Sequence, residues 1–267
     1  MNRLLLSGVL AFLPITPPRM AFPGGHEDLW LGFKRHTFQV DGCECWLVEP
    51  KLPLAGNHWL WSMMFPADFA DRTGVTALLA QGYYYAYMSV GNTFGAPSAL
   101  AHLSAFYRAM TGAGLRSKAV LLGLSRGGLY AYNWAAQNPE KVSVICGDAP
   151  VCNFASWPYG HGAGSHSEAW QSLLALYGFK TDAEALACPT QPIREMKPIA
   201  RARIALITVV GDADINVPYA ENTALIEREC KKLGAEITVI HKPGGAHHPH
   251  GLADPAPVVS FIIEHDR

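Results

Sequence analysis

A serine between two glycines stands at the junction of a predicted strand and a predicted helix. Val120–Leu122 is a short apolar run typical of a buried parallel strand, and Gly123-x-Ser125-x-Gly127 follows at once. Small residues on both sides of the serine let strand and helix pass closely while the turn strains the serine backbone. Gly128 adds room for the helix. This turn would present the Ser125 hydroxyl as a nucleophile, although a glycine-rich turn with a solvent-facing serine has the same pattern.

Two aspartates compete for the role of an acid acting with this serine. Asp214 lies at the tip of a Gly-Asp-Ala-Asp turn, between a predicted strand and a predicted helix. A buried aspartate there could hold the tautomer of an imidazole and stabilise its protonated form, or it could merely cap the helix. Asp148, after an earlier strand, is the alternative acid, and Asp212 could serve the turn itself. We expect Asp214 to be the acid.

Three histidines compete for the role of the base. His247 stands first after the small-residue turn that follows the last predicted strand, where a histidine could act as general base. His248 and His250 are the alternatives. Three histidines in four residues also suggest a metal, since imidazole binds zinc and copper. A metal site would need a carboxylate or cysteine at a suitable spacing, and the chain has no HExxH pattern. We therefore expect no metal.

The elements around these loops alternate between strand and helix. Apolar runs predict strands at residues 32–40, 43–48, 58–65, 83–90, 120–122, 142–146, 204–210 and 237–241. Helical patterns cover residues 73–81, 98–110 and 219–233, and the segment from the serine turn to about residue 138. Ser98 is expected to cap one helix and Gly234 to end another. The alternation predicts an α/β fold with a doubly wound, mostly parallel sheet, opened by an antiparallel hairpin through Asp41-Gly42.

One region departs from this alternation. Residues 151–197 follow a strand, on the side where open α/β sheets place their ligands, and we expect them to form a cap insertion over the active site. An ordinary surface excursion of helices and loops is the alternative. The main domain is expected to cover residues 31–267, after a lead of residues 1–30.

Composition limits the partners of this chain. The 267 residues are 49% hydrophobic and 16% charged, which is typical of a globular domain. A net charge of −1 gives no global attraction to nucleic acid or to an anionic membrane, and no apolar run reaches 18 residues. We expect neither nucleic acid nor membrane as a partner.

The start of the chain leaves the location open. Met1-Asn2-Arg3 followed by Leu4–Leu13 resembles a secretory signal, but prolines interrupt it and Arg19-Met20-Ala21 makes a poor cleavage site. Periplasmic or secreted and cytoplasmic locations are expected equally. Cys152 and Cys188 could form a disulfide in an exported protein, although free buried cysteine is the more common state.

The chain order Ser125, Asp214, His247 is that of the α/β-hydrolase triad. Over nearly its whole length, the sequence resembles an α/β-hydrolase-fold serine esterase. The resemblance implies attack by Ser125, an acyl-enzyme and hydrolysis by water that His247 activates, with no cofactor. It also implies an oxyanion hole from the backbone N–H of Arg126 and that of Phe65 or a neighbour. The lipase-type His-Gly-Gly-Gly is absent there, since Met-Met precedes Phe65.

Gly-Leu-Ser-Arg-Gly-Gly-Leu-Tyr around the serine and Gly-Gly-Ala-His-His-Pro-His-Gly-Leu near the end resemble bacterial hydrolases often grouped with carbohydrate esterases. This resemblance implies a sugar ester as substrate, either an O-acyl group or a uronate methyl ester. Arg126 could then pair with a carboxylate, or could belong to a structural ion pair. Trp157 and Trp170 could stack on a sugar ring, although aromatic residues in a cap commonly serve packing.

The sequence therefore predicts a serine hydrolase of small-molecule or carbohydrate esters. A peptidase or amidase of the same fold is an alternative, because the triad serves both kinds of bond. A binding module that has kept the fold and lost the chemistry is the other, and it would be expected to lack a member of the triad.

Overall fold

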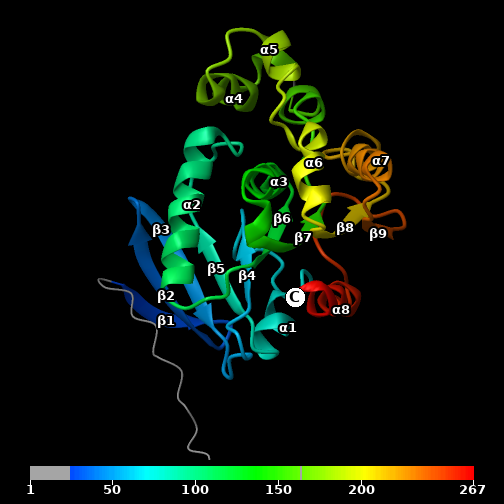
Figure 1. The fold of residues 1–267 in the computed structure, drawn as a ribbon. Helices are drawn as coiled ribbons and strands as arrows, with labels where there is room; N and C mark the ends of the chain where they lie inside the picture. The colour runs from blue at the N-terminus through cyan, green and yellow to red at the C-terminus, as the bar shows by residue number, and fades with distance from the viewer. Residues whose placement is uncertain (1–24, 163) are drawn as a thin grey trace, which may run out of the picture.

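The computed structural model describes residues 25–162 and 164–267. Within these residues the core is one nine-stranded sheet in the order β1-β2-β3-β5-β4-β6-β7-β8-β9, with helices on both faces (Figure 1). The strands are β1 (His26–Trp30), β2 (Phe33–Val40), β3 (Cys43–Glu49), β4 (Trp59–Ser62), β5 (Tyr84–Met88), β6 (Ala119–Leu124), β7 (Val142–Asp148), β8 (Ala205–Gly211) and β9 (Thr238–Lys242). The helices are α1 (Val75–Ala80), α2 (Pro97–Gly112), α3 (Gly127–Gln137), α4 (Glu168–Tyr177), α5 (Asp182–Leu186), α6 (Met196–Arg201), α7 (Thr223–Leu233) and α8 (Ala256–His265).

The sheet is mostly parallel, as predicted. Strands β1, β2, β3 and β5 pair antiparallel, and β5, β4, β6, β7, β8 and β9 pair parallel. The predicted hairpin joins β2 to β3 through Asp41 and Gly42, which both have positive φ. Parallel neighbours end at the same edge, so the loops that leave the carboxyl ends of β6, β7, β8 and β9 meet there.

Strand β1 was not predicted. It pairs with β2 along its whole length, from His26 opposite Thr37 to Trp30 opposite Phe33. The sheet therefore begins before the expected domain boundary at residue 31. This strand is an edge strand with mostly exposed residues, so it lacks the apolar run of a buried strand. Residues 1–24, with the segment that resembles a secretory signal, lie outside the described residues.

Alternate side chains of the central strands serve two separate cores. In β6, Leu121 packs into the cluster that contains α2, α3, α6 and α7. Its neighbours Val120 and Leu122 pack into the cluster that contains α1 and α8. Successive side chains of a strand point to opposite faces, so a strand covered on both sides has no polar face. This is why every residue of β6 is buried.

Two helix ends differ from the expectation. Helix α2 has Ala96 at its N-cap and Pro97 in its first turn, so Ser98 lies inside the helix and does not cap it. Proline suits the first turn because its φ is already helical and it has no N–H to satisfy. The segment 219–233 is interrupted at Asn222, where φ is −128° and ψ is −88°, and α7 begins only at the next residue. Gly234 ends α7 in the left-handed conformation, as predicted.

The expected cap region is helical. Short helical turns at Ala155–Gly160, Gly164–His166 and Pro192–Arg194 accompany α4 and α5, which lie beyond α3 at the top of Figure 1. Tyr177 at the end of α4 anchors this region, because its hydroxyl donates to the Phe94 carbonyl (3.0 Å) and accepts from the Asn133 amide of α3 (3.3 Å). The cap region thus rests on the helix that follows the serine.

Two further expectations concern the whole chain. Across residues 25–162 and 164–267, the helices are too short or too polar to cross a lipid bilayer. All six cysteines are free thiols, so the disulfide considered for Cys152 and Cys188 is not formed.

Candidate active site

Ser125 occupies a strained turn between β6 and α3. Its φ is +48°, which a residue with a side chain adopts only where the surroundings impose it. The Ser125 N–H donates to the Asp148 carbonyl (2.9 Å), and the Ser125 carbonyl accepts from the Val151 N–H (2.8 Å). A Cβ on Gly128 would lie 2.7 Å from the Val151 carbonyl oxygen. The loop after β7 therefore clamps the turn, and glycine is required where that loop touches α3.

The structure brings the three expected triad residues into one hydrogen-bonded chain. The Ser125 hydroxyl lies 3.0 Å from His247 Nε2, and His247 Nδ1 lies 2.7 Å from the Asp214 carboxylate. An ionised Asp214 can only accept, so Nδ1 carries the proton and Nε2 is left to accept from the serine. His247 and Asp214 are 7% and 6% exposed, whereas Ser125 is half-buried. Ser125 is thus the member of this hydrogen-bonded chain that solvent reaches.

The surroundings of Asp214 keep it ionised. Burial raises the pKa of this carboxyl, but the hydrogen bond from His247 and those from the N–H groups of Val217 (2.9 Å) and Asn216 (2.8 Å) outweigh burial. The pKa of Asp214 is therefore below its ordinary value. The two backbone donors bind Oδ1, which leaves Oδ2 to orient the imidazole.

The alternative acid and an alternative base pair with each other. His250 Nδ1 lies 2.5 Å from Asp148 Oδ1, and the Gly251 N–H donates to Asp148 Oδ2 (2.7 Å). Both side chains of this second pair are 4% exposed. Asp148 thus contacts the Ser125 backbone through its carbonyl and the histidine loop through its carboxylate.

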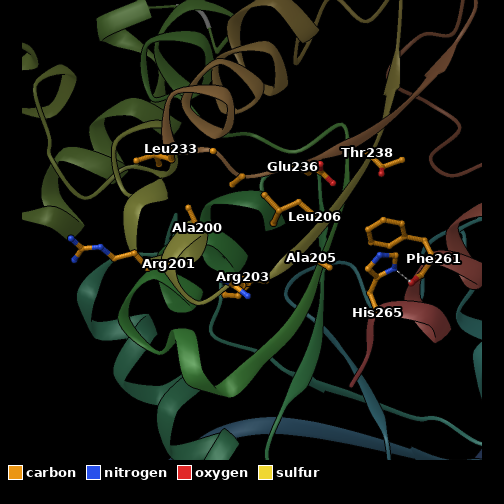
Figure 2. Close-up of a pocket in the computed structure, with 13 residues that line it drawn as sticks. Ala200, Arg201, Arg203, Ala205, Leu206, Leu233, Glu236, Thr238, Phe261 and His265 are labelled. Atoms are coloured by element: carbon orange, nitrogen blue, oxygen red, sulfur yellow. Dashed lines mark hydrogen bonds between the residues drawn. The ribbon is translucent and has the colours of Figure 1, made fainter.

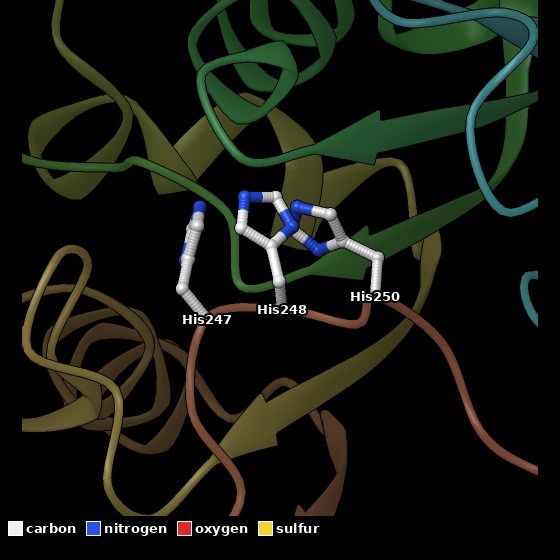
Figure 3. Close-up of side chains that lie close together, drawn as sticks. All are labelled: His247, His248 and His250. Carbon is white, nitrogen blue, oxygen red and sulfur yellow. The ribbon is translucent and has the colours of Figure 1, made fainter.

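The rings of His247, His248 and His250 lie edge to face, with each pair of centroids 4.8 Å apart (Figure 3). One nitrogen from each ring lies within 4.8 Å of the other two, a grouping that could hold a metal. A metal bound to all three rings would have to take His247 Nε2 from Ser125 or Nδ1 from Asp214. Desolvation and the neighbouring imidazoles of His250 and His247 lower the pKa of His248. A metal held by all three rings would thus break the hydrogen-bonded chain of Ser125, His247 and Asp214.

The loop after β4 lies against the serine turn. The Met63 N–H donates to the Leu122 carbonyl (3.0 Å), and a Cβ on Gly127 would lie 3.4 Å from Met64 Cβ. Phe65 follows with a φ of +56°. Within the described part of the chain, neither the Phe65 N–H nor the Arg126 N–H takes part in a backbone hydrogen bond. Both N–H groups expected to bind the oxyanion are therefore free of backbone acceptors in the described part of the chain.

Arg126 and Trp157 lie together, whereas Trp170 is elsewhere. The Arg126 guanidinium carbon is 5.9 Å from the centre of the Trp157 ring, which is half-buried. Trp170 is fully buried, packs edge to face on Tyr159 and donates its indole N–H to Asp182 (2.8 Å). Its ring has no face for a sugar, so the expected substrate contact of Trp170 is wrong. The ring belongs to the interior of the cap region.

Asn92 is a contact that the sequence did not indicate. Its side-chain oxygen accepts from Arg126 (2.8 Å), and its loop is held by the Tyr130 hydroxyl of α3. Asn92 is separated from Arg126 by 34 residues, and nothing in its own surroundings marks it as a partner. Its position shortly after β5, at the same end of the strands as the serine turn, is the feature of the sequence that could have indicated this contact.

A hollow of about 790 Å³ lies at the opposite end of the parallel strands, where β8 and β9 begin (Figure 2). Its walls include the first residues of β8 and β9, namely Ala205, Leu206 and Thr238, and Arg201 at the end of α6. No serine or cysteine lines it in the described part of the chain. The triad residues stand at or after the carboxyl ends of their strands, so this hollow is not the candidate active site.

Comparisons with known proteins agree with this architecture. No protein-family model matches the chain. It is 26% identical over 140 residues to acylamino-acid-releasing enzyme 2 of Oryza sativa subsp. japonica, a match that covers 49% of this chain and 17% of that protein. The chain thus spans only a small part of that relative.

Solved structures resemble a larger part of the chain. The S-formylglutathione hydrolase from Agrobacterium tumefaciens has a TM-score of 0.61 at 14% identity, covering 90% of this chain and 95% of that one. The acylaminoacyl peptidase of Pyrococcus horikoshii has a TM-score of 0.59 at 14% identity, covering 81% and 38%. Identities this low show the fold and not the activity. The fold of this chain is the α/β-hydrolase fold.

Proposed function

We propose that this protein is a serine hydrolase that cleaves carboxylic esters through an acyl-enzyme. The observation that carries the proposal is the chain from Ser125 through His247 to Asp214, with contacts of 3.0 Å and 2.7 Å. Nucleophile and base are already within hydrogen-bond reach, and a buried carboxylate orients the base. The strained backbone of Ser125 adds support, because such strain persists only where the surrounding structure imposes it.

The proposed reaction has two halves. Ser125 Oγ attacks the ester carbonyl as its proton moves to His247 Nε2, and Asp214 stabilises the imidazolium. The negative charge that develops on the carbonyl oxygen faces the N–H groups of Arg126 and Phe65. When the tetrahedral intermediate collapses, the C–O bond to the alcohol breaks and His247 returns its proton to the leaving oxygen. Water then gives a proton to His247 and attacks the acyl-serine. When this second intermediate collapses, the bond from the acyl carbon to Ser125 Oγ breaks and His247 returns its proton to Oγ, which releases the acid and restores Ser125.

A carbohydrate ester is our proposed substrate. It is supported by the resemblance of the serine and histidine segments to bacterial hydrolases grouped with carbohydrate esterases. Trp157 adds support, because its half-buried ring lies near Arg126 at the turn that carries the nucleophile. Aromatic rings at such places can stack on the apolar face of a sugar.

Hydrolysis of an acylated amino acid or peptide is the second candidate. It is favoured by the similarity to acylamino-acid-releasing enzyme 2 over about half of the chain. The same triad can cleave either bond, since His247 can protonate an amine as well as an alcohol. The two candidate reactions differ in the leaving group, which is an alcohol or an amine. Rates measured with ester and with amide substrates therefore distinguish them.

The test compares hydrolysis of p-nitrophenyl acetate and butyrate by the wild type, Ser125→Ala and Ser98→Ala. Ser98 is an exposed serine of α2, and its replacement controls for the loss of a hydroxyl. We expect turnover by the wild type and Ser98→Ala and a loss of at least about 10³-fold in Ser125→Ala. Acetylated sugars, uronate methyl esters and acyl-amino-acid amides then rank the substrates. A folded wild type that hydrolyses no ester, or an undiminished Ser125→Ala, would refute the proposal.

A further inference from the structure

The side chain of Arg126 lies next to the nucleophile and has only neutral partners. One terminal nitrogen donates to the Asn92 side-chain oxygen (2.8 Å). The guanidinium carbon lies 5.1 Å from the centre of the Phe65 ring and 5.9 Å from that of Trp157. Over the described residues, no carboxylate forms an ion pair with Arg126. The structural ion pair considered from the sequence is therefore not formed.

Two arginines elsewhere in the chain, in contrast, have carboxylate partners. Arg35 pairs with Asp28 and Arg116 with the buried Asp266. A guanidinium has five N–H donors, and the bond to Asn92 uses one of those on Arg126. The four remaining donors have no partner in the described part of the chain. A half-buried cation of this kind has donors suited to the two oxygens of a carboxylate.

The guanidinium is also held in place. Tyr130 of α3 fixes the loop of Asn92, because its hydroxyl accepts from the Thr93 N–H (2.8 Å) and donates to the Gly91 carbonyl (3.2 Å). The rings of Phe65 and Trp157 then flank the cation. Aromatic faces attract a guanidinium without neutralising it. The charge is thus positioned before a ligand arrives, which lowers the entropy lost on binding.

We propose that Arg126 recognises a carboxylate on the substrate, so that the preferred esters are anionic. This inference rests on the proposed function, because Arg126 directly follows Ser125 in the turn that would bind the scissile carbonyl. The substrate class is an ester whose acyl part or alcohol part carries a free carboxylate in addition to the ester bond. The side chain would confer specificity, and the backbone N–H of the same residue would serve the oxyanion.

The test measures kcat/KM for two pairs of esters that differ in charge. Mono-p-nitrophenyl glutarate against p-nitrophenyl butyrate places the charge on the acyl part. 4-Acetoxybenzoate against 4-acetoxybenzamide places it on the alcohol part. The readout is the ratio of kcat/KM for the charged ester to kcat/KM for the neutral ester. A disturbed oxyanion turn would slow both esters of a pair and would leave this ratio unchanged.

We expect one pair to show a ratio of at least about tenfold in the wild type, falling toward one in Arg126→Gln, mainly through KM. Arg126→Lys should retain part of the ratio and Asn92→Ala should lower it, because the cation is then less well held. Arg201→Gln is the matched control, since it removes the same charge at the opposite edge of the sheet (Figure 2). The wild-type ratio should also fall as salt is added.

Three results would overturn the inference. If neither pair favours its charged member, Arg126 does not recognise a carboxylate, and the proposed function still stands as long as Ser125→Ala abolishes turnover of the neutral esters. If Arg126→Gln lowers both members equally, the side chain supports the turn alone. If the wild type hydrolyses no ester of either charge, both the inference and the proposed function fail.

Discussion

Replacing Asp214 with asparagine tests the assignment of the acid, and the structure fixes what the amide would meet. In one orientation the amide oxygen keeps the N–H groups of Asn216 and Val217, and the NH₂ faces His247 Nδ1. The imidazole then carries its proton on Nε2 and cannot accept from Ser125. In the other orientation the NH₂ opposes two backbone donors that now lie 2.8 Å and 2.9 Å from the carboxylate.

The expected loss of activity follows from these two orientations of the amide. Leaving the buried Val217 donor and the part-buried Asn216 donor without an acceptor costs up to about 1–3 kcal/mol each, so the active tautomer would lie up to about 2–6 kcal/mol above the inactive one. The imidazolium also loses the neighbouring negative charge. With about 1.4 kcal/mol per tenfold in rate, we expect kcat/KM to fall about 10³–10⁴-fold, as the same exchange does in serine proteases.

Asp148→Asn is the matched control. It makes the same change in the second buried Asp–His pair, which does not touch the Ser125 hydroxyl. Release of p-nitrophenol from p-nitrophenyl acetate gives the rates, and near-ultraviolet circular dichroism shows that both variants are folded. We expect Asp148→Asn to retain activity within about tenfold of the wild type. A folded Asp214→Asn with near-normal activity, or a larger loss in Asp148→Asn, would refute the reasoning and move the acid to β7.

Three further perturbations test what stabilises the fold. The pKa of Asp214 is lowered in the folded state, so its carboxylate stabilises the protein above about pH 4, and this contribution is lost as the pH falls through the folded-state pKa. The amount by which the Tm of the wild type exceeds that of Asp214→Asn should therefore shrink between pH 5 and pH 3. A constant Tm difference would contradict this sign. Gly128→Ala places a Cβ 2.7 Å from Pro150 Cβ, and urea unfolding should show a loss of about 1–3 kcal/mol, whereas an unchanged midpoint would mean that the loop yields freely. Asp266→Ala removes the buried carboxylate that lies 2.6 Å from His58 Nδ1 and 3.6 Å from the Arg116 guanidinium, and the same assay should show a loss of about 3 kcal/mol with kcat retained in the folded enzyme.

The sequence predicted the part of the site that depends on loops at strand ends. Ser125, Asp214 and His247 follow three strands of a parallel sheet, and such strands end at one edge whatever lies between them in the chain. Their positions along the sequence were therefore enough to expect them together. The choice among three histidines was open in the sequence, and it is the contact of His247 with Ser125 that distinguishes them.

Other parts depend on contacts that local patterns do not encode. Trp157 and Trp170 both lie in the segment expected to form the cap, yet one ring lies near Arg126 and the other is buried in the cap region. The contact between Asn92 and Arg126 joins residues 34 positions apart, so a local sequence pattern does not indicate it. Strand β1 was missed because an exposed edge strand is specified by pairing with its neighbour and not by an apolar run.

The contacts of Asp148 affect where the sequence of this protein can change during evolution. Its carbonyl binds the backbone of Ser125 and its carboxylate binds His250 and Gly251, so a single strand end sets the distance between nucleophile and base. None of these three contacts involves the cap region. Insertions, deletions and new side chains beyond Val151, whose N–H binds the Ser125 carbonyl, could accumulate without shifting the reactive atoms. Selectivity and reactivity could therefore evolve as separate modules, which meet where Val151 binds Ser125 and where Arg126 lies near Trp157.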